Sequence, residues 1–429
     1  MSLADDAKIL LIPSGYKTAT PNGKLYSVFP TDGNQDFRID RATTGTRINP
    51  GGLIETMLAD TPRLDHFGGN CPSVLREVGR TNLVLFSEQF SGSNWGSVNT
   101  TITANQTISP DAELTGDKLQ RTSTSASYRA HNISKSATAT TYTTSAFIKK
   151  GSDDYFAMRA QGSYPSRVDI RFRFDTEQIY SATAVSNFTL LDYGVQNYSN
   201  GWYRLNFTYT SDTHTNLSIT FSPRATDGNI DSSDTSSTSF AYVWGAQVEQ
   251  GIGATSYIKT TTASVTRNLD NINCENETYE TGNDVTWFLD FDSYTFTNSF
   301  RPLIVIRNSG FTETMDWISY NSGSDYYFRI RVTNQSSLQT IIAFGQNAIQ
   351  MFQRNKVAVR LYGSNYEIYV NGVREYTGTS TNGDWKIINN SAILNDFGSH
   401  SEAPSMKLYD FRVYDKTMTQ SDLETLTTL

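Results

Sequence analysis

Charge is the first property that this sequence has little of. Only 18% of its 429 residues are charged, whereas roughly 25% is usual for a soluble domain. The 35 basic residues are outnumbered by 43 acidic ones, which leaves a net charge of −8. This balance excludes a broad basic surface of the kind that binds nucleic acid by neutralising phosphates.

Cysteine and histidine are also scarce. The two cysteines, Cys71 and Cys274, lie far apart in the sequence, and a secreted disulfide scaffold would carry a denser set. We therefore expect both thiols to be free. The four histidines are scattered, and no CxxC pair or Cys/His cluster occurs, which argues against a zinc site.

Long apolar runs are missing as well. No segment approaches the roughly 18 apolar residues that a membrane span needs. The first residues, MSLADDAKILLIP, place Asp5 and Asp6 where a signal peptide needs positive charge, and the apolar run stops at Pro13. We therefore expect no secretory signal and synthesis in a cytoplasm.

Aromatic and small polar residues dominate instead. The chain holds 24 Tyr, 23 Phe and 6 Trp, whereas a disordered chain carries few aromatic residues. Together with abundant Ser, Thr, Asn and Gly, they suit half-buried strands that are joined by tight turns. The composition predicts an all-β protein, and the length predicts about three domains.

Alternating patterns divide the chain into segments. Residues 1–80 contain short strand candidates but too little apolar mass for a core, so we expect an N-terminal anchoring segment that packs on a partner surface. Residues 81–270 hold many short alternating runs, and in RVDIRFRF the side chains of Val168, Ile170 and Phe172 share one face. Such runs, separated by Ser/Gly/Asn turns, predict a β-sandwich.

A second β-rich block is expected at residues 284–429, after a polar linker at 271–283. The runs KVAVRL and YEIYV flank Gly363-Ser364-Asn365, which predicts a hairpin. Asn371-Gly372 follows directly and is a type I′ turn signal. Two hairpins in succession predict a meander.

The end of the chain has a different pattern. Thr419 is followed three residues later by Asp422, which resembles a capping box. Leu423 and Leu426 lie one helical turn apart on the same face. We predict one short C-terminal helix from Thr419 to Thr427.

Several stretches resemble virion proteins of tailed bacteriophages. They are FRIDRATTGTRINPGGLIE (37–55), CPSVLREVGRTNLVLFSEQFSGSNW (71–95) and YVWGAQVEQGIGATSYIKTTTASVTR (242–267). With SPDAELTGDKLQRT (109–122) and NGWYRLNFT (200–208), they are similar to the carbohydrate-binding-like jelly roll of phage tail and head-fibre proteins. The resemblance implies a jelly-roll sandwich at residues 81–270.

The C-terminal block resembles a different family. The hairpin YGSNYEIYVNGVREYTG (362–378) and the tail KLYDFRVYDKTMTQSDLETL (407–426) are similar to laminin-G-like, concanavalin-A-like sandwiches. That fold serves enzymes, lectins and scaffolds alike, so it does not define an activity. The two resemblances together imply tandem β-sandwiches after the N-terminal segment.

The phage resemblance also implies a function. It implies a structural virion protein, namely a fibre, spike or decoration unit, that is made in the host cytoplasm and exposed on the virion. A host surface glycan and other virion proteins (capsid, portal, tail or baseplate) are then the expected partners. Unpaired strand edges in residues 1–80 favour association, and the resemblance implies a homotrimer.

Aromatic residues in polar segments are the candidate glycan-binding residues, because a ring packs on the apolar face of a sugar while polar neighbours bond its hydroxyls. The candidates in the second sandwich are Trp317, Tyr320, Tyr326, Tyr327, Trp385 and His400. Those in the first sandwich are Trp95, Tyr128, Tyr155 and Tyr164. For Trp317 and Trp385 a core position is an equal alternative. The alternating runs place Trp202, Trp244 and Trp287 in the core.

A tail-associated glycan depolymerase is the alternative function, and it requires a pair of carboxylates. Asp290 and Asp292 lie two residues apart on a predicted strand and therefore share a face. No Glu lies at the expected reach, and no GxSxG, HExxH, Walker or GxGxxG pattern occurs in a suitable context. We therefore predict no catalytic residues and no enzyme activity.

No cofactor and no metal ligand is predicted, although acidic turns leave a structural calcium open. The acidic residues that lie nearest together are Asp111, Glu113 and Asp117 in one group and Asp227, Asp231 and Asp234 in another. Calcium takes roughly six to eight oxygens from several loops, and no EF-hand spacing is present. Ordinary turn chemistry explains the aspartates equally well.

Arg38, Arg41, Arg47 and Arg63 are four of the arginines in the N-terminal segment. They suit docking on an acidic subunit, and the alternative is a solvated edge. Because the segment has little core of its own, we favour docking.

Overall fold

The fold is all-β and consists of tandem β-sandwiches, as predicted, and the described part of the chain holds one short α-helix. The computed structural model describes residues 3, 6–7, 9–13, 19–20, 23–26, 38–69, 71–273, 284–293, 301–308, 314–322, 325–333, 339–344, 353–379, 391–392, 405–416 and 418–429. The helix in this part of the chain is too short and too polar to cross a membrane.

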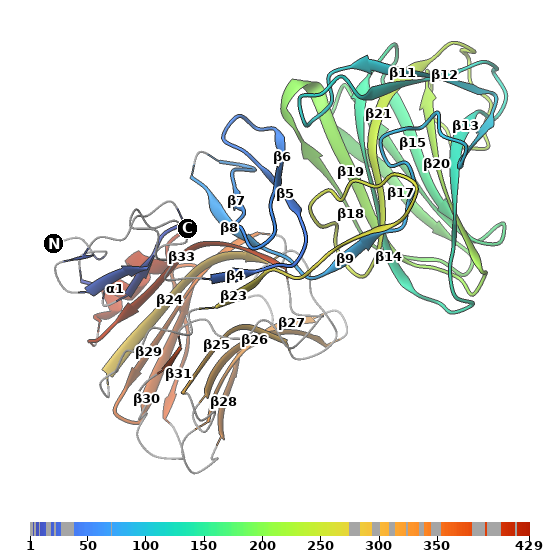
Figure 1. Cartoon of the computed structure of the whole chain (residues 1–429). Coiled ribbons are helices and arrows are strands. Elements are labelled where there is room, and N and C mark those ends of the chain that lie inside the picture. The colour runs from blue at the N-terminus through green and yellow to red at the C-terminus, as the bar shows by residue number, and fades with distance from the viewer. Residues whose placement is uncertain are drawn as a thin grey trace. The chain divides into compact units, whose positions relative to one another are not determined.

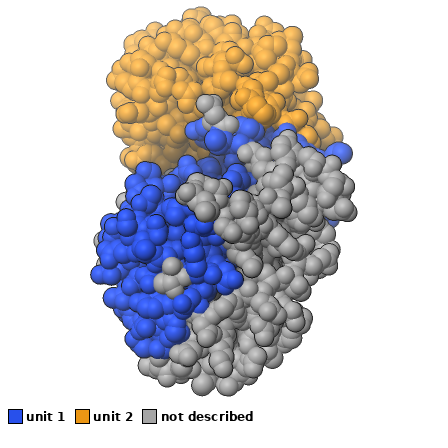
Figure 2. Space-filling view, turned by 90° about the vertical axis from the view of Figure 1, so that its left-hand side faces the viewer, with its two compact units in different colours: residues 1–47, 57–79, 268–429 blue, residues 48–56, 80–267 orange. Residues whose placement is uncertain are grey.

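The chain divides into two compact units, which Figure 2 shows in different colours. Unit 1 comprises residues 1–47, 57–79 and 268–429, and unit 2 comprises residues 48–56 and 80–267. This division differs from the expected one, which treated residues 1–80 as a separate segment. The difference arises because strands from the N-terminal residues belong to a sheet of the C-terminal block.

Two six-stranded antiparallel sheets form unit 2 (Figure 1). One sheet has the strand order β10 (Trp95–Val98), β13 (Tyr128–Ser134), β20 (Asn216–Arg224), β15 (Tyr155–Gln161), β16 (Arg167–Arg173), β17 (Gln178–Val185). The other has the order β11 (Thr100–Thr107), β12 (Gly116–Arg121), β21 (Phe240–Gln250), β14 (Thr141–Lys150), β19 (Trp202–Thr210), β18 (Thr189–Asn197). A short turn of 3-10 helix, Ser199–Gly201, precedes β19, and β9 (Arg80–Asn82) pairs with β22 (Val265–Arg267).

The core of unit 2 follows from the alternating pattern. Val168, Ile170 and Phe172 on β16 are fully buried in one hydrophobic cluster, as RVDIRFRF predicts. Trp202 and Trp244 are also fully buried. A buried indole needs an acceptor, and their indole N–H groups donate to the carbonyl of Ile108 at 2.8 Å and to the hydroxyl of Thr115 at 3.0 Å. Both tryptophans are therefore core residues, as predicted.

A large sheet forms the main part of unit 1 (Figure 1). Its strand order is β2 (Ala19–Thr20), β3 (Gly23–Tyr26), β1 (Ile9–Leu11), β33 (Met406–Tyr414), β24 (Asp284–Ser293), β29 (Arg354–Tyr362), β30 (Asn365–Val370), β31 (Val373–Thr379). Two further strands, β7 (Leu64–Asp65) and β8 (Ser73–Arg76), join it where β8 pairs with β33. Trp287 on β24 is fully buried, as predicted.

Unit 1 also contains a five-stranded sheet. Its order is β28 (Gln339–Phe344), β27 (Asp325–Thr333), β26 (Thr314–Ser322), β25 (Arg301–Asn308), β32 (Ser391–Ala392). Besides the β9–β22 pair, two further two-stranded ribbons lie outside the main sheets. In one, β4 (Arg38–Asp40) pairs with β23 (Asn271–Asn273), and in the other, β5 (Gly45–Ile48) pairs with β6 (Ile54–Met57).

The last strand, β33, joins the two ends of the chain. One edge of β33 pairs with β24, and the other edge pairs with β8 at Met406–Leu408 and with β1 further along. Ile9 lies opposite Val413, and Arg76 lies opposite Met406. The N-terminal residues thus extend a sheet of their own chain, which supplies the apolar mass that they lack by themselves.

Buried arginines hold the N-terminal residues in place. Arg41 and Arg63 are each 1% exposed, and both bind the carboxylate of Asp270, Arg41 through Nη1 at 2.7 Å. Arg63 also donates to Glu77 at 2.7 Å. The expectation that these two arginines dock on a separate subunit is therefore wrong, because acids of the same unit neutralise them. Arg47 donates to the Leu64 carbonyl at 3.3 Å, and the side chain of Arg38 lies outside the described residues.

The local signals of the C-terminal block are confirmed. Strands β29 and β30 form the predicted hairpin, and the next turn has positive φ at Asn371 (49°) and Gly372 (85°), as a type I′ turn requires. Helix α1 (Gln420–Thr427) begins with a complete capping box between Thr419 and Asp422. Its residues Leu423 and Leu426 are buried.

Candidate functional site

An open cavity of about 390 Å³ lies among three loops at one end of the unit 2 sandwich. The loops are the β15–β16 hairpin (162–166), the β17–β18 turn (186–188) and the β19–β20 connection (211–215). Polar side chains and one tyrosine dominate its lining, namely Ser163, Tyr164, Asn187, Asp212, Thr213 and His214. The volume falls in the range of small-molecule sites, which is roughly 300–1,000 Å³.

Asp212 links two of these loops. Its carboxylate accepts hydrogen bonds from the backbone N–H of Ser163 at 2.9 Å and of His214 at 3.1 Å. Gly162 lies against the carboxylate, and a Cβ at that position would approach its oxygens to 2.2 Å. The Asp212 side chain is buried and already has two donors, so its role is to fix the loops that form the cavity.

Lys135 strengthens the same loop. Its ammonium group donates to the backbone carbonyl of Asp212 at 2.7 Å and to the carbonyls of Ser136 and Thr138. Burial lowers the pKa of Lys135, and the nearby Asp212 carboxylate partly opposes this. The cavity wall is therefore held by hydrogen bonds of side chains to the backbone, which suits a preformed site.

Tyr164 is the exposed aromatic residue of the site. Its side chain is 69% exposed, which is unusual for a residue of this size. Arg167, the first residue of β16, lies over the Tyr164 ring at 5.5 Å from the centroid and donates to the Pro165 carbonyl at 3.1 Å. The guanidinium group thus supports one side of the hairpin and leaves the tyrosine at the cavity mouth.

This arrangement suits a small polar ligand with an apolar face. The tyrosine ring offers a stacking surface, and Ser163, Asn187 and His214 offer hydroxyl, amide and imidazole groups at the same cavity. Neutral hydroxyl-bearing ligands such as sugars fit this combination, because each hydroxyl both donates and accepts a hydrogen bond.

Four of the six predicted site residues of the second sandwich lie on strands and not in loops. Trp317 and Tyr320 lie on β26, and Tyr326 and Tyr327 lie on β27, where Tyr320 pairs with Tyr327. Positions 317 and 320 are three residues apart, so they belong to opposite faces of a pleated strand. Their side chains lie outside the described residues, as do Trp385 and His400 entirely.

The aromatic candidates of the first sandwich divide into three kinds. Trp95 is 3% exposed and stacks on Phe90 with ring centroids 4.3 Å apart, so its prediction as a binding residue is wrong. Tyr128 and Tyr155 are partly buried. Tyr164 is the candidate that the fold places at the cavity.

An arginine binds one of the two carboxylates on β24. Asp290 is 3% exposed and accepts two hydrogen bonds from Arg354, at 2.7 and 2.6 Å. Burial raises the pKa of Asp292, with Lys407 acting in the opposite direction. The bidentate contact gives Asp290 a structural role in the sheet.

The acidic groups considered for calcium bind protein groups. Asp227 accepts from Arg171 at 2.6 Å and from the Tyr180 hydroxyl, and Asp231 forms two bonds of 2.8 Å with Arg159. In the other group, Asp111 accepts from the Ser109 hydroxyl at 2.5 Å. Within the described ranges, no three His, Cys, Asp or Glu side chains come together as metal ligands.

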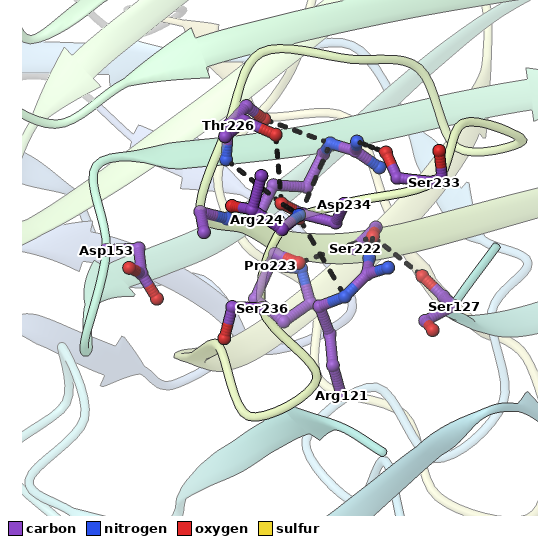
Figure 3. Close-up of polar contacts among 12 residues, drawn as sticks. Arg121, Ser127, Asp153, Ser222, Pro223, Arg224, Thr226, Ser233, Asp234 and Ser236 are labelled. Carbon is purple, nitrogen blue, oxygen red and sulfur yellow. Dashed lines mark hydrogen bonds and ion pairs between the residues drawn. The ribbon is translucent and has the colours of Figure 1, made fainter. Parts of the chain in front are cut away.

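Asp234, the third member of its group, anchors the connection between β20 and β21. It accepts hydrogen bonds from Ala225, Thr226 and Thr235. Figure 3 shows Asp234 between Arg224 and Arg121, whose guanidinium nitrogens lie 3.9 and 3.8 Å from its carboxylate. This connection, residues 225–239, is therefore a fixed loop and not a flexible link.

Of the residues that line this cavity, the sequence predicts Tyr164 as a binding residue and gives no indication of the others. The sequence indicates Tyr164, because a tyrosine in a Ser/Gly/Pro turn has no core to fill. Asn187, Asp212 and His214 carry no such signal, because isolated polar residues in turns are common. They become a site only because three loops from different hairpins end at the same side of the sandwich.

Comparison with known proteins adds little to this description. No family model matches the chain, and no curated protein matches it. One similar solved structure is the CBM40 of the Ruminococcus gnavus IT-sialidase bound to alpha2,3 sialyllactose, with 14% sequence identity, 34% of this chain and 83% of that chain covered, and a TM-score of 0.29.

Two further solved structures are similar to this chain to about the same degree. Domain 4 of AbnA, a GH43 extracellular arabinanase from Geobacillus stearothermophilus in complex with arabinotriose, has 15% identity and covers 41% of this chain and 82% of its own, with a TM-score of 0.29. A SAP-like pentraxin from Limulus polyphemus has 15% identity, 35% and 72% coverage, and a TM-score of 0.29. At these values the likeness carries neither fold nor function over to this chain.

Proposed function

We propose that this protein is a non-enzymatic, glycan-binding structural protein of a tailed-phage virion, as a fibre, spike or decoration unit. The cavity of unit 2 carries the binding part of the proposal, because it joins an exposed tyrosine ring to fixed polar groups. The sequence stretches that resemble phage fibre proteins support the virion part. In that setting the partners are a host surface glycan and other virion proteins, and the assembly is a homotrimer.

Glycan binding is tested with the full chain. We expect isothermal titration against host-surface oligosaccharides to show binding that Tyr164→Ala weakens up to about tenfold, because a stacking ring contributes up to about 1.4 kcal/mol. Tyr193→Ala is the matched control, since Tyr193 is 48% exposed and lies on β18 of the other sheet. Equal affinity of the wild type and Tyr164→Ala would show that the cavity does not bind the glycan.

The non-enzymatic part has its own test. Incubation with host polysaccharide is expected to release no reducing sugar, because the Asp290 carboxylate is held by Arg354. Turnover that Asp290→Asn abolishes would instead identify a depolymerase.

Immunogold labelling of purified particles tests the virion location, and light scattering after size exclusion tests the trimer.

A further inference from the structure

The outer face of strand β16 carries three arginines and one aspartate. Arg167, Asp169, Arg171 and Arg173 occupy this face, opposite the buried Val168, Ile170 and Phe172. The strand begins at the cavity hairpin and extends about 20 Å away from it, at roughly 3.3 Å per residue. The face is therefore continuous with the cavity.

Three tyrosines lie along this face, each beside one of its arginines. The guanidinium of Arg167 lies over Tyr164 at 5.5 Å, that of Arg171 over Tyr180 at 5.4 Å, and that of Arg173 over Tyr155 at 5.3 Å from the ring centroid. Tyr155 and Tyr180 also contact each other edge to face, at 6.0 Å. The result is a row of aromatic rings from the cavity to the far end of β16.

A β-bulge explains how Tyr180 joins the row. Arg171 pairs with Ser181 and Phe172 pairs with Ile179, so Tyr180 is the extra residue of β17. Bulges re-aim a side chain in this way. The Tyr180 hydroxyl donates to Asp227, and the residue remains 36% exposed.

Charges on this face are balanced. The arginines are Arg159, Arg167, Arg171 and Arg173, and the aspartates that pair with them are Asp169, Asp175, Asp227 and Asp231. The side chains of Asp227 and Asp231 are 51% and 50% exposed. They come from the loop 225–239, which Asp234 and Arg224 fix in place. These two carboxylates would repel an acidic polymer. A neutral polymer can instead form hydrogen bonds with both the donors and the acceptors of this face.

We propose that this face is an extended binding track for a neutral polysaccharide chain, with the cavity holding one end of the chain. The tyrosine rings stack on sugar rings of the chain. The partly exposed N–H groups of Arg167, Arg171 and Arg173 and the carboxylate oxygens of Asp227 and Asp231 bond the hydroxyls. This proposal rests on the proposed glycan-binding function and names its ligand class. It also assigns Tyr155 and Tyr180 as residues that distinguish long chains from short ones.

Affinity as a function of chain length tests the track. The full-length protein is titrated with short and long neutral malto-, cello-, xylo- and arabino-oligosaccharides, and with acidic oligogalacturonate. We expect tighter binding of long neutral chains, which Tyr155→Ala and Tyr180→Ala each weaken about tenfold, with a far smaller effect on short ones. Tyr164→Ala weakens both. Tyr180→Phe, which keeps the ring, is expected to weaken long-chain binding less than Tyr180→Ala.

The controls separate this proposal from the one on which it rests. Tyr193→Ala should bind long chains as the wild type does, and thermal unfolding should show that each variant is folded. If Tyr164→Ala weakens binding but Tyr155→Ala and Tyr180→Ala do not, the track is refuted and the cavity remains a site. Tighter binding of oligogalacturonate than of neutral chains would refute the ligand class. Absence of binding to every sugar would refute the glycan-binding function itself.

Discussion

His131 is a titratable residue in the core of unit 2. It is 2% exposed, and its ring packs edge to face on Trp95 at 5.0 Å. Its Nε2 accepts a hydrogen bond from the backbone N–H of Leu85 at 3.2 Å, so the proton of the neutral ring lies on Nδ1. Burial lowers the pKa of His131 to about 4, and the folded protein therefore keeps this ring neutral well below neutral pH.

Acid sensitivity follows from this residue. The unfolded chain binds a proton on His131 near pH 6.5 and the folded chain only near pH 4. Stability is therefore lost as the pH falls through this interval, by about 3 kcal/mol. In urea unfolding, the advantage of the wild type over His131→Gln should shrink by that amount between about pH 7 and about pH 4. A difference that stays constant with pH would contradict the assignment.

At the scale of elements, polar contacts and not a hydrophobic core hold the loop 225–239 in place. Arg224 is 1% exposed and donates to the carbonyls of Asn229, Ser232 and Ser233. Burial raises the pKa of Asp234, but hydrogen bonds from Thr226 and from backbone N–H groups outweigh this and lower it overall. The loop therefore holds a charged network in one arrangement without regular secondary structure.

Removing the Asp234 carboxylate should release the loop. Asp234→Ala leaves Arg121 and Arg224 buried without their counter-charge, which costs about 3–5 kcal/mol. Thermal unfolding and limited proteolysis within residues 225–239 measure the loss. Asp227→Ala in the same loop is the control, because its half-exposed ion pair contributes about 1 kcal/mol or less. Equal effects of the two variants would show that the buried network does not hold the loop.

At the scale of the whole molecule, unit 1 depends on both ends of the chain. The edge of β33 that does not face β24 is covered by β1 and β8. Apolar residues of both ends also share one cluster, in which Ala7 and Leu10 pack with Phe288, Tyr414 and Leu423. The C-terminal block is therefore not a complete domain without the N-terminal residues.

Truncation tests this dependence. A fragment of residues 284–429 should associate or precipitate, because the edge of β33 and part of the apolar cluster become exposed. A chain in which a short Gly/Ser linker replaces residues 80–267 keeps both ends and should stay folded and soluble. Size exclusion and circular dichroism compare the two. A stable, monomeric fragment 284–429 would show that the N-terminal strands are dispensable.

The sequence by itself determined the local structure of this protein. The alternation around Ile170 specifies a strand with one buried face, and the capping box at Thr419 specifies where the helix begins. Both predictions succeed because the physical cause lies within a few residues, in side-chain direction and in backbone hydrogen bonds. The exposure of Tyr164 is also a local property, since it follows from the tight turn that carries this residue.

Only the tertiary structure decided which distant residues meet. The sequence around Arg63 indicates a surface arginine, whereas the structure places the carboxylate of Asp270, some 200 residues later, beside it. In the same way, β1 is an isolated apolar triplet until it pairs with β33, and the cavity exists only when three hairpin loops converge. Such contacts depend on strand order and register, which are set by the packing of the whole sheet and leave no local pattern in the sequence.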